Sequence, residues 1–428
     1  MKILYVIHDF LPKHQAGAEI YTYLLAKELS KKHEVRLFFT EINTLSKSYT
    51  VTERTVSELQ CIEVFRPQKT DKAGVSYNDA TMEKIFTTLL VDFKPDIIHL
   101  QHLLYHSLRY PEIAKQFNIP VIFTLHDYWL TCPRWGQRLQ RNMEICYIVD
   151  LKKCADCIYE SQENSGRLTL SSLLNIFREK FTGRRTLEDK TDAMIKRNAE
   201  ALMATGNIDL FIAPSHFLRN TFIDFGVPDN KIIFSDHGFD ISSYSKKEKR
   251  NGSLIRFGFI GTINEHKGVH VLIDAFNSIP KEKAELYIYG DLSWFPAYSA
   301  KLKKMATSPA IFFKGAIPNN VVADILADID ILVVPSIWFE NSPLTIHEAF
   351  LAGVPVITSN IGGMADLITD HTNGLLFEVN DSASLSRVIK ELIESDSLLD
   401  QLREGIPPVK SIQENGLEIE KLYKQLLG

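Results

Sequence analysis

The chain has 428 residues, of which 45% are hydrophobic and 24% are charged. This length exceeds what one ordinary hydrophobic core holds, so we expect two domains, and this composition excludes disorder over most of the chain. The formal net charge of −5 argues against a protein that coats nucleic acid, because that task needs a broad basic surface. Five cysteines are too few for a secreted disulfide scaffold.

The sequence contains no apolar run of about 18 residues, which is the length that a membrane-spanning helix needs. The apolar run that follows Met1 and Lys2 ends after five residues at His8, and no small-residue cleavage site follows it. We therefore expect neither a transmembrane helix nor a signal peptide, and a cytoplasmic location is the default interpretation.

The first half of the chain alternates strand-like and helix-like segments. Residues 3–7 form a β-branched apolar run of strand length, and the apolar residues that follow have helical spacing: Ile20, Leu24, Leu25 and Leu29. Further strand-like runs occur at 35–40, 97–100, 121–125 and 211–213. Because these runs are apolar throughout, they indicate parallel strands covered on both faces. The pattern predicts a doubly wound α/β domain over residues 1–241.

The same pattern starts again after a polar, lysine-rich connection at 242–253, which we interpret as a linker and hinge. Strand-like runs lie at 256–260, 286–289, 311–313, 331–334 and 354–358, with helical stretches at 268–278 and 319–328 among them. These segments predict a second doubly wound domain over 254–410. Ligands of such sheets bind beyond the carboxyl ends of the strands, so we expect a cleft between the two domains.

A last helix is predicted within 411–428, after Pro407 and Pro408, and we expect it to pack back on the first domain. Its apolar face would consist of Ile412, Leu417, Ile419, Leu422 and Tyr423.

Two carboxylates eight residues apart, Glu340 and Glu348, lie in the segment 335–357. Glu340 follows a predicted strand, Pro343 suits the first turn of a helix, and Glu348 falls one to two turns into that helix. The free N–H groups of a helix start favour a diphosphate, and carboxylates accept hydrogen bonds from sugar hydroxyls. The alternative is that Glu348 is an ordinary exposed helix residue.

This segment resembles the E-x7-E region of retaining glycosyltransferase family four, the glycosyl transferases group 1. The resemblance covers nearly the whole chain and rests on the order of several landmarks: 261–268, which ends in Lys-Gly, 352–356, Gly362-Gly363, 373–375, Pro214-Ser215 and 237–240. It implies the GT-B fold, in which two Rossmann-like domains face a central cleft.

The resemblance implies donor-side roles for several residues of the second domain. Glu348 would bind the ribose hydroxyls, Glu340 the transferred sugar, and Lys267 the diphosphate, for which a flexible point charge is suited. The alternative for Lys267 is a solvated loop lysine. The phosphates would also meet the backbone of Asn341, Ser342, Pro343 and Leu344 and the glycine loop that begins at Gly261.

Two further positions bear on the donor. Gly290, after the predicted strand 286–289, resembles the glycine that lets the donor approach the backbone. Thr262 is a departure, because many members carry an arginine there as a second phosphate ligand. Charge stabilisation would then depend more on Lys267 and on backbone dipoles.

On the first domain, the resemblance points to the loops after three strands. Gly17 lies in a loop that the family uses near the phosphates and the acceptor, although Ala16 stands where a glycine is usual. His126, after the run 121–125, resembles the active-site histidine that approaches the donor sugar. His99 and His102 are predicted to line the cleft, and His102 is a candidate contact for the acceptor.

The resemblance implies metal-independent chemistry with no required cofactor. The nucleoside diphosphate would leave the anomeric carbon, and an acceptor hydroxyl would attack on the same face with retention. Asp328 and Asp330 fit an Asp-x-Asp pattern, but they precede a buried strand and are interpreted as a helix end. We assign no covalent carboxylate nucleophile.

The expected partners are a UDP- or GDP-sugar of hexose type and a glycan or lipid-linked acceptor, in cell-envelope polysaccharide or glycolipid synthesis. The alternatives are a GT-B phosphorylase, a sugar-nucleotide epimerase, or a non-catalytic protein that binds sugar nucleotides. A phosphorylase would need free phosphate as a co-substrate.

Four of the five cysteines fall within 26 residues: Cys132, Cys146, Cys154 and Cys157. They belong to a Cys-rich insert expected near 130–200. The last two form a C-x2-C pair, which in a cytosolic chain favours a metal over a disulfide, and four thiolates suit a structural zinc. The alternatives are unpaired thiols or redox disulfides.

Residues 167–185 carry five basic side chains and one acidic side chain, with leucines and phenylalanines between them. A basic amphipathic stretch of this kind is typical of contact with an anionic membrane surface, which would place the protein peripherally at the inner face of the membrane. The alternative is a helical excursion packed on the first domain.

Overall fold

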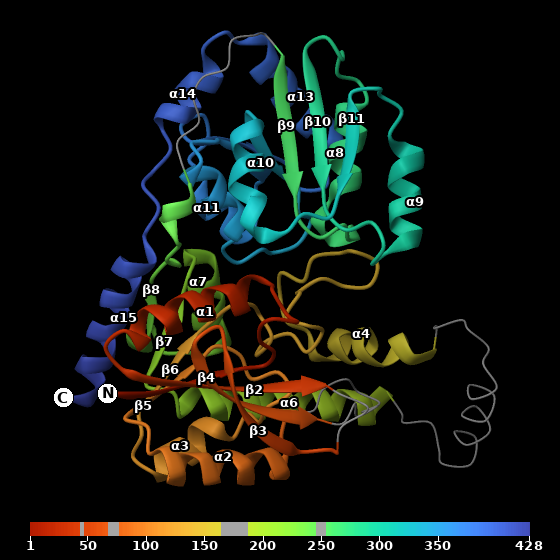
Figure 1. Ribbon diagram of the computed structural model, residues 1–428. Helices are drawn as coiled ribbons and strands as arrows, with labels where there is room; N and C mark the ends of the chain where they lie inside the picture. The colour runs from red at the N-terminus through yellow and green to blue at the C-terminus, as the bar shows by residue number, and fades with distance from the viewer. Residues whose placement is uncertain (43–46, 67–76, 164–186, 245–253) are drawn as a thin grey trace. The chain divides into compact units, whose positions relative to one another are not determined.

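The computed structural model describes residues 1–42, 47–66, 77–163, 187–244 and 254–428 (Figure 1). The chain divides into two compact units. Unit 1 consists of Met1–Ala213, Arg219–Phe234 and Glu418–Gly428, and unit 2 consists of Pro214–Leu218 and Ser235–Leu417. The predicted basic stretch 167–185 lies outside the described residues.

Unit 1 is built on an eight-stranded sheet with the order β3-β4-β2-β1-β5-β6-β7-β8. The strands are β1 (Lys2–Ile7), β2 (Glu34–Ile42), β3 (Thr50–Val56), β4 (Leu59–Arg66), β5 (Ile97–Leu100), β6 (Val121–Thr124), β7 (Leu210–Ala213) and β8 (Ile232–Phe234). All neighbouring strands are parallel except β3, which is antiparallel to β4. The four residues of β5 and those of β6 are all buried, as expected for strands covered on both faces.

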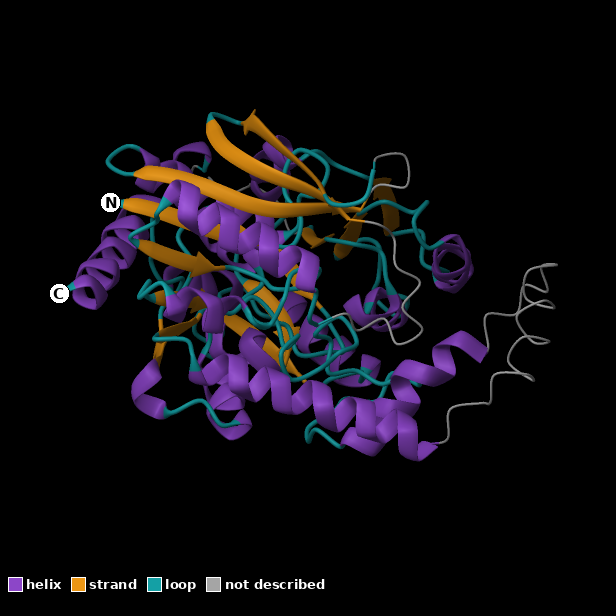
Figure 2. Ribbon diagram, turned by 90° about the horizontal axis from the view of Figure 1, so that it is seen from below, coloured by secondary structure: helices purple, strands orange, loops and turns teal. Residues whose placement is uncertain are grey.

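The helices that accompany this sheet are α1 (Gly17–Ser30), α2 (Ala80–Phe93), α3 (Tyr110–Gln116), α4 (Leu151–Glu163), α6 (Leu187–Gly206) and α7 (His216–Phe225), with a short 3-10 turn at Asp229–Lys231. Asp79 begins α2 by accepting hydrogen bonds from the amides of Thr81 and Met82. Figure 2 shows α4 and α6, the helices on either side of the grey trace, running alongside each other.

Unit 2 contains a six-stranded sheet with the order β11-β10-β9-β12-β13-β14, in which every neighbouring pair is parallel. The strands are β9 (Ile255–Ile260), β10 (Ala284–Tyr289), β11 (Ile311–Gly315), β12 (Ile331–Val334), β13 (Val356–Ser359) and β14 (Gly374–Phe377). The helices are α8 (Val269–Phe276), α9 (Pro296–Met305), α10 (Val322–Asp328), α11 (Leu344–Leu351), α12 (Gly362–Leu367), α13 (Ser382–Glu394), α14 (Leu398–Glu404) and α15 (Ile412–Leu427), with 3-10 turns at Glu265–Lys267 and Asn319–Val321. The predicted class of two parallel-sheet α/β units is confirmed.

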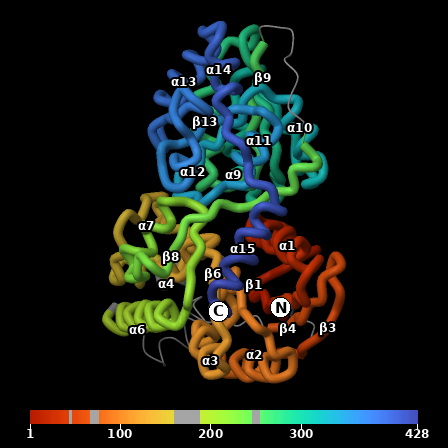
Figure 3. The backbone as a smooth tube through the Cα atoms, turned by 90° about the vertical axis from the view of Figure 1, so that its left-hand side faces the viewer, coloured from red at the N-terminus to blue at the C-terminus, as the bar shows by residue number. Residues whose placement is uncertain are grey.

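The end of α15 belongs to unit 1 and lies beside β1, so that both termini are close together (Figures 1 and 3). The Tyr423 hydroxyl lies 2.9 Å from the Tyr5 hydroxyl and 2.6 Å from His99 Nδ1, and all three side chains are buried. Leu417 is 58% exposed, so its predicted place on the apolar face was wrong. Asn415, which is fully buried, lies on the inner side instead.

The two units depart from the predicted ranges in short segments. Residues 214–218 join unit 2, where Ser215 Oγ donates to Asn341 Oδ1 at 2.9 Å. Residues 235–241 also join unit 2, because the backbone of Phe239 bonds to Lys410 and Ile412. Backbone pairing of this kind cannot be seen in the composition of a segment.

No helix among the described residues has both the length and the apolar character that crossing a membrane requires.

Candidate functional site

Lys267 is placed in unit 2 by a loop that joins β9 to α8. The loop ends at Gly268, whose backbone is left-handed with φ of +69°. A Cβ atom there would lie 1.8 Å from the carbonyl oxygen of Pro335, so the loop packs directly on the segment after β12. The carboxyl ends of β9 and β12 are neighbours in the sheet, and this contact brings Lys267 to the loop that carries Glu340.

Glu340 is 8% exposed and accepts three hydrogen bonds on one oxygen. The donors to Oε1 are Lys267 Nζ at 2.6 Å, Ser336 Oγ at 2.7 Å and Trp338 Nε1 at 2.8 Å. Burial by itself raises the pKa of Glu340, but Lys267, Ser336 and Trp338 together outweigh it, so the pKa lies below its ordinary value. The side chain is therefore a carboxylate at neutral pH.

The residues between Glu340 and α11 are held by side chains of unit 2. Ser342 Oγ lies 2.9 Å from His347 Nε2 and donates to Asp236 Oδ1 at 3.1 Å. Pro343 is the N-cap residue and Leu344 is the first residue of α11, so the helix starts one residue later than predicted. The N-cap residue Pro343 makes no side-chain cap hydrogen bond, and the N–H groups at a helix start suit an anion.

Glu348 lies one turn into α11 and is mostly shielded from solvent. Burial raises its pKa, and a hydrogen bond from Tyr244 acts in the opposite direction. Tyr244 follows the 3-10 turn Ile241–Ser243 and is itself largely buried. The alternative of an ordinary exposed helix glutamate is therefore wrong.

Gly290 follows β10 and touches the glycine loop. A Cβ atom at this position would lie 2.2 Å from the Gly261 carbonyl oxygen and 2.8 Å from the Ile263 side chain. Packing within unit 2 therefore already requires glycine at position 290, whether or not a ligand also approaches this backbone.

In unit 1, His126 follows β6 and is partly buried. Its Nε2 lies 2.7 Å from Gln101 Oε1, which comes after the neighbouring strand β5, and its ring meets that of Tyr21 edge-on. The carboxyl ends of β5 and β6 thereby bring the two side chains together, as expected for adjacent parallel strands.

His102 is 5% exposed and pairs with Asp127. The Leu104 amide donates to Nδ1 at 3.0 Å, so Nδ1 carries no proton, and Nε2 donates to Asp127 Oδ2 at 3.1 Å. This arrangement fixes the tautomer of His102.

Two residues that were not predicted, His8 and Glu19, join this group. His8 Nε2 lies 3.2 Å from Glu19 Oε1, and the rings of His8 and His102 are 4.4 Å apart. Burial raises the pKa of Glu19 and lowers that of His8, which neighbouring histidines lower further. His8 follows β1, so its place at a strand end was the signal that could have found it.

His99, by contrast, was wrongly predicted to line a cleft. It is fully buried within β5, where Nδ1 meets Tyr423 and Nε2 lies 2.7 Å from Thr124 Oγ1. Burial lowers the pKa of His99 to about 3, so the ring is neutral. Gly17 is exposed as the first residue of α1, after Ala16, which caps the helix without a side-chain hydrogen bond.

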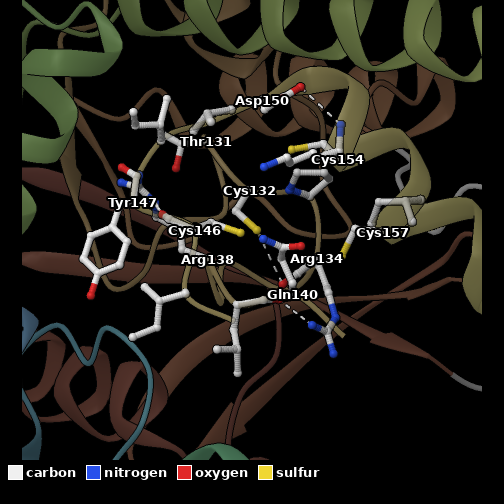
Figure 4. Close-up of a pocket in the computed structure, with 17 residues that line it drawn as sticks. Thr131, Cys132, Arg134, Arg138, Gln140, Cys146, Tyr147, Asp150, Cys154 and Cys157 are labelled. Atoms are coloured by element: carbon white, nitrogen blue, oxygen red, sulfur yellow. Dashed lines mark hydrogen bonds between the residues drawn. The ribbon is translucent and has the colours of Figure 1, made fainter. Parts of the chain in front are cut away.

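The four clustered cysteines line one cavity of about 370 Å³ in unit 1 (Figure 4). Cys132 and Cys146 come from the loop before α4, and Cys154 and Cys157 come from α4 itself. All four are partly buried and none is in a disulfide. Within the described ranges, no three His, Cys, Asp or Glu side chains are already grouped as metal ligands.

Comparison with protein families finds two matches, each on a different part of the chain. The family described as Glycosyltransferase Family 4 matches residues 16–163, and the family described as Glycosyl transferases group 1 matches residues 240–407.

Two relatives illustrate the range of sequence similarity. The putative colanic acid biosynthesis glycosyltransferase WcaL of Salmonella typhimurium is 25% identical over 200 residues, which cover 44% of this chain and 49% of that protein. A 42.6 kDa protein from the cps region of Klebsiella pneumoniae is 23% identical over 386 residues, which cover 86% of this chain and 87% of that protein. The first match thus spans about half the length of the relative, and the second spans most of it.

Solved structures with the same fold include sucrose-phosphate synthase from Thermosynechococcus elongatus, with a TM-score of 0.68, 15% identity and coverage of 99% of this chain and 98% of that chain. Anabaena HepE in complex with UDP has a TM-score of 0.68 and 16% identity, with coverage of 99% and 100%. The predicted GT-B fold is thereby confirmed.

Proposed function

Because the chain belongs to the glycosyltransferases of family 4 and group 1, we propose that it transfers a hexose from a nucleotide-sugar donor to an acceptor hydroxyl with retention. The observation that carries this proposal is the contact of Lys267 with Glu340, 2.6 Å apart, beside the uncapped start of α11. A cation, a carboxylate and free helix N–H groups form a set that suits a sugar diphosphate.

Lys267 would stabilise the leaving diphosphate. Its ammonium group has three N–H donors, and one of them bonds to Glu340. The others are available to phosphate oxygens, together with the amides of Ser342 and Leu344. Positive charge from Lys267 and from the α11 dipole supports departure of the nucleotide without a metal ion.

The two glutamates would bind the sugar and the ribose. All three donors to Glu340 converge on Oε1, so Oε2 is the oxygen that a hydroxyl of the transferred sugar would reach. Glu348 accepts from Tyr244 in this structure, and the ribose hydroxyls would take the place of that donor.

The acceptor side would use the histidine group of unit 1. His126 and His102 stand at neighbouring strand ends, and three buried polar atoms near them have no hydrogen-bond partner within the described residues: His8 Nδ1, Glu19 Oε2 and Gln101 Nε2. Buried polar atoms are nearly always hydrogen-bonded in proteins, and the hydroxyl groups of an acceptor sugar would provide hydrogen bonds to these three atoms.

The names of similar proteins support polysaccharide or glycolipid synthesis as the setting and a UDP-sugar as the donor. WcaL is named for colanic acid biosynthesis, the Klebsiella protein for a cps region, and HepE is bound to UDP. A peripheral position at the inner face of the membrane stays a prediction, because the basic stretch that motivated it lies outside the described residues.

The test begins with a thermal-shift screen against UDP-, GDP- and ADP-sugars, since a ligand that binds the folded state raises the melting temperature. The sugar that stabilises the protein is then incubated with lipid-linked oligosaccharide acceptors without added divalent metal. We expect release of the nucleoside diphosphate and, by proton NMR, a product with the anomeric configuration of the donor. An inverted product would overturn retention, and a response to none of the sugars would overturn the transferase proposal.

The phosphorylase alternative is separated by the same assay. Turnover that requires inorganic phosphate and yields a sugar 1-phosphate would favour a phosphorylase. Turnover that is unchanged by added phosphate supports the transferase.

A further inference from the structure

The four clustered cysteines lie apart in the sequence and yet face one cavity. Figure 4 shows the sulfur atoms of Cys132, Cys146, Cys154 and Cys157 on the wall of this cavity. Cys154 and Cys157 are three residues apart on α4, which puts them on the same side of the helix.

A tight turn places Cys132 on the wall of the cavity. The Cys132 thiol donates to the Arg134 carbonyl at 3.8 Å. The turn closes through a bond from the Gly136 amide to the Cys132 carbonyl at 3.1 Å. Gly136 has φ of +65°, and a Cβ atom there would lie 2.7 Å from the Asp127 carboxyl carbon. These contacts fix the turn that carries Cys132.

A buried arginine provides a second, independent observation. Arg197 on α6 is 2% exposed, donates to the carbonyls of Trp129 and Leu130, and has an Nε atom with no hydrogen-bond partner in the described parts of the chain. Apart from burial, the groups that act most on its charge are Cys132 and Cys154. A buried cation needs negative charge nearby, and neutral thiols do not supply it.

Four thiolates around one zinc ion carry a net charge of −2, because four negative charges surround two positive ones. Arg134 and Arg138 line this cavity, so two arginine side chains lie beside the place where that charge would be.

We propose that Cys132, Cys146, Cys154 and Cys157 bind one structural zinc ion in this cavity of unit 1. The thiols surround the cavity without yet meeting at one point, so binding draws the loop of Cys132 and Cys146 toward α4. Soft thiolate ligands and a four-residue donor set select zinc over magnesium or calcium.

The ion would connect two parts of the insert, which are α4 and the loop that carries Cys132 and Cys146. α4 packs on α6 around the buried residues Ala155 and Met194, and the loop before α4 begins just after His126. Zinc would therefore fix the wall next to the histidine group without touching substrate. This inference goes beyond the transferase proposal, and its test does not depend on activity.

The experiment measures metal content in the full chain, purified without chelators from zinc-supplemented medium. We expect about one zinc per chain by elemental mass spectrometry. A mercurial reagent that reacts with thiols should release this zinc in proportion to the thiols modified. Replacement by cobalt should give the visible absorption of tetrahedral thiolate coordination. These measurements use the unaltered protein, so they hold even where a variant fails to fold.

The variants are Cys146→Ser and Cys157→Ser, with Cys61→Ser as the matched control. Cys61 is the fifth cysteine and is buried in β4, where its thiol donates to the Leu59 carbonyl. The first two should lose zinc and the control should keep it. Absence of stoichiometric metal, or a mass lower by two hydrogens for each disulfide formed, would overturn the proposal. Stoichiometric iron with strong visible absorption would overturn zinc as the ion.

Discussion

Lys267 provides the positive charge that the proposed chemistry needs, and its replacement gives a first prediction. Lys267→Ala removes a cation 2.6 Å from Glu340 and beside the start of α11. Loss of one preorganised electrostatic group costs about 100- to 1000-fold in kcat. We expect a fall of that order in the rate of nucleoside diphosphate release.

Lys301→Ala is the control for this variant. Lys301 lies 3.6 Å from Glu265 with both side chains about half exposed, so its removal should leave the rate unchanged. Equal rates for Lys267→Ala and Lys301→Ala would contradict the role of Lys267.

The second prediction concerns the pH dependence of stability at Glu340. Burial raises its pKa, but Lys267 and two further donors outweigh burial and hold it below the ordinary value of 4.5. A carboxyl group with a lowered folded-state pKa adds stability above the unfolded-state pKa, and this contribution is lost as the pH falls through the folded-state value. The difference in unfolding free energy between the unaltered chain and Glu340→Gln should therefore be constant near neutral pH and shrink below pH 4.5.

Urea unfolding followed by circular dichroism over this pH range measures the difference. Glu265→Gln, at a half-exposed glutamate of the same loop region, should give a curve parallel to that of the unaltered chain. A constant difference down to the acid transition would show that the ion pair does not hold Glu340 ionised.

Gly268 allows the third prediction, on the loop that places Lys267. In Gly268→Ala, the left-handed backbone and a Cβ atom 1.8 Å from the Pro335 oxygen both oppose the native loop. We expect a loss of more than about 2 kcal/mol in unfolding free energy. Gly206→Ala is the control, because a Cβ atom at Gly206 meets nothing within 4 Å, and it should change stability by less than about 0.5 kcal/mol. Equal stability of the two variants would contradict this account.

At the scale of elements, the sequence predicts central strands better than edges. β5 and β12 were predicted to the residue, because β12 is an uninterrupted apolar run and β5 is apolar except for His99. β3 and β4 were missed, because β3 lies at the edge of the sheet and alternates exposed and half-buried residues, with only Val56 buried. Their turn has two residues, Ser57 and Glu58, with φ of +47° and +75°. No glycine marks this turn, so the usual sequence signal of a hairpin is lacking.

The attachment of α15 gives a prediction at this scale. Tyr423→Phe removes a buried hydroxyl that meets Tyr5 and His99, and it leaves His99 Nδ1 without that partner. Such a loss costs about 1–3 kcal/mol. Tyr23→Phe is the control, since its hydroxyl meets Lys27 on a partly exposed helix face, and a change below about 0.5 kcal/mol is expected there. Urea unfolding compares the two variants, and equal stability would argue against α15 as a structural part of unit 1.

At the scale of the whole molecule, the order of strands and helices in the sequence predicts which residues belong to the site. It does not predict which of these side chains contact each other. Glu340, Lys267 and His126 all follow strands, which the alternating pattern made visible. The pairing of Lys267 with Glu340 was not visible, because 73 residues separate the two. The same holds for Asp236, which meets Ser342 from a segment with no pattern of its own. Long-range pairs of this kind are decided by the fold and not by local spacing.

The segment 235–244 carries the last prediction, because it follows the last strand of unit 1 and is held by the proposed donor site of unit 2. Asp236 accepts from Ser342 at the start of α11, and Tyr244 bonds to Glu348 one turn later. A nucleotide bound at both places should slow amide hydrogen exchange in α11 and in 235–244.

Saturation at 100 times the dissociation constant stabilises the bound state by about 2.7 kcal/mol, which sets the upper limit of the effect. Exchange around Tyr423 in unit 1 should stay unchanged, and Glu348→Ala should weaken the response in both segments of unit 2. Equal slowing of exchange in both units would indicate general stabilisation of the chain and contradict binding at this site. Unchanged exchange in 235–244 would also contradict it.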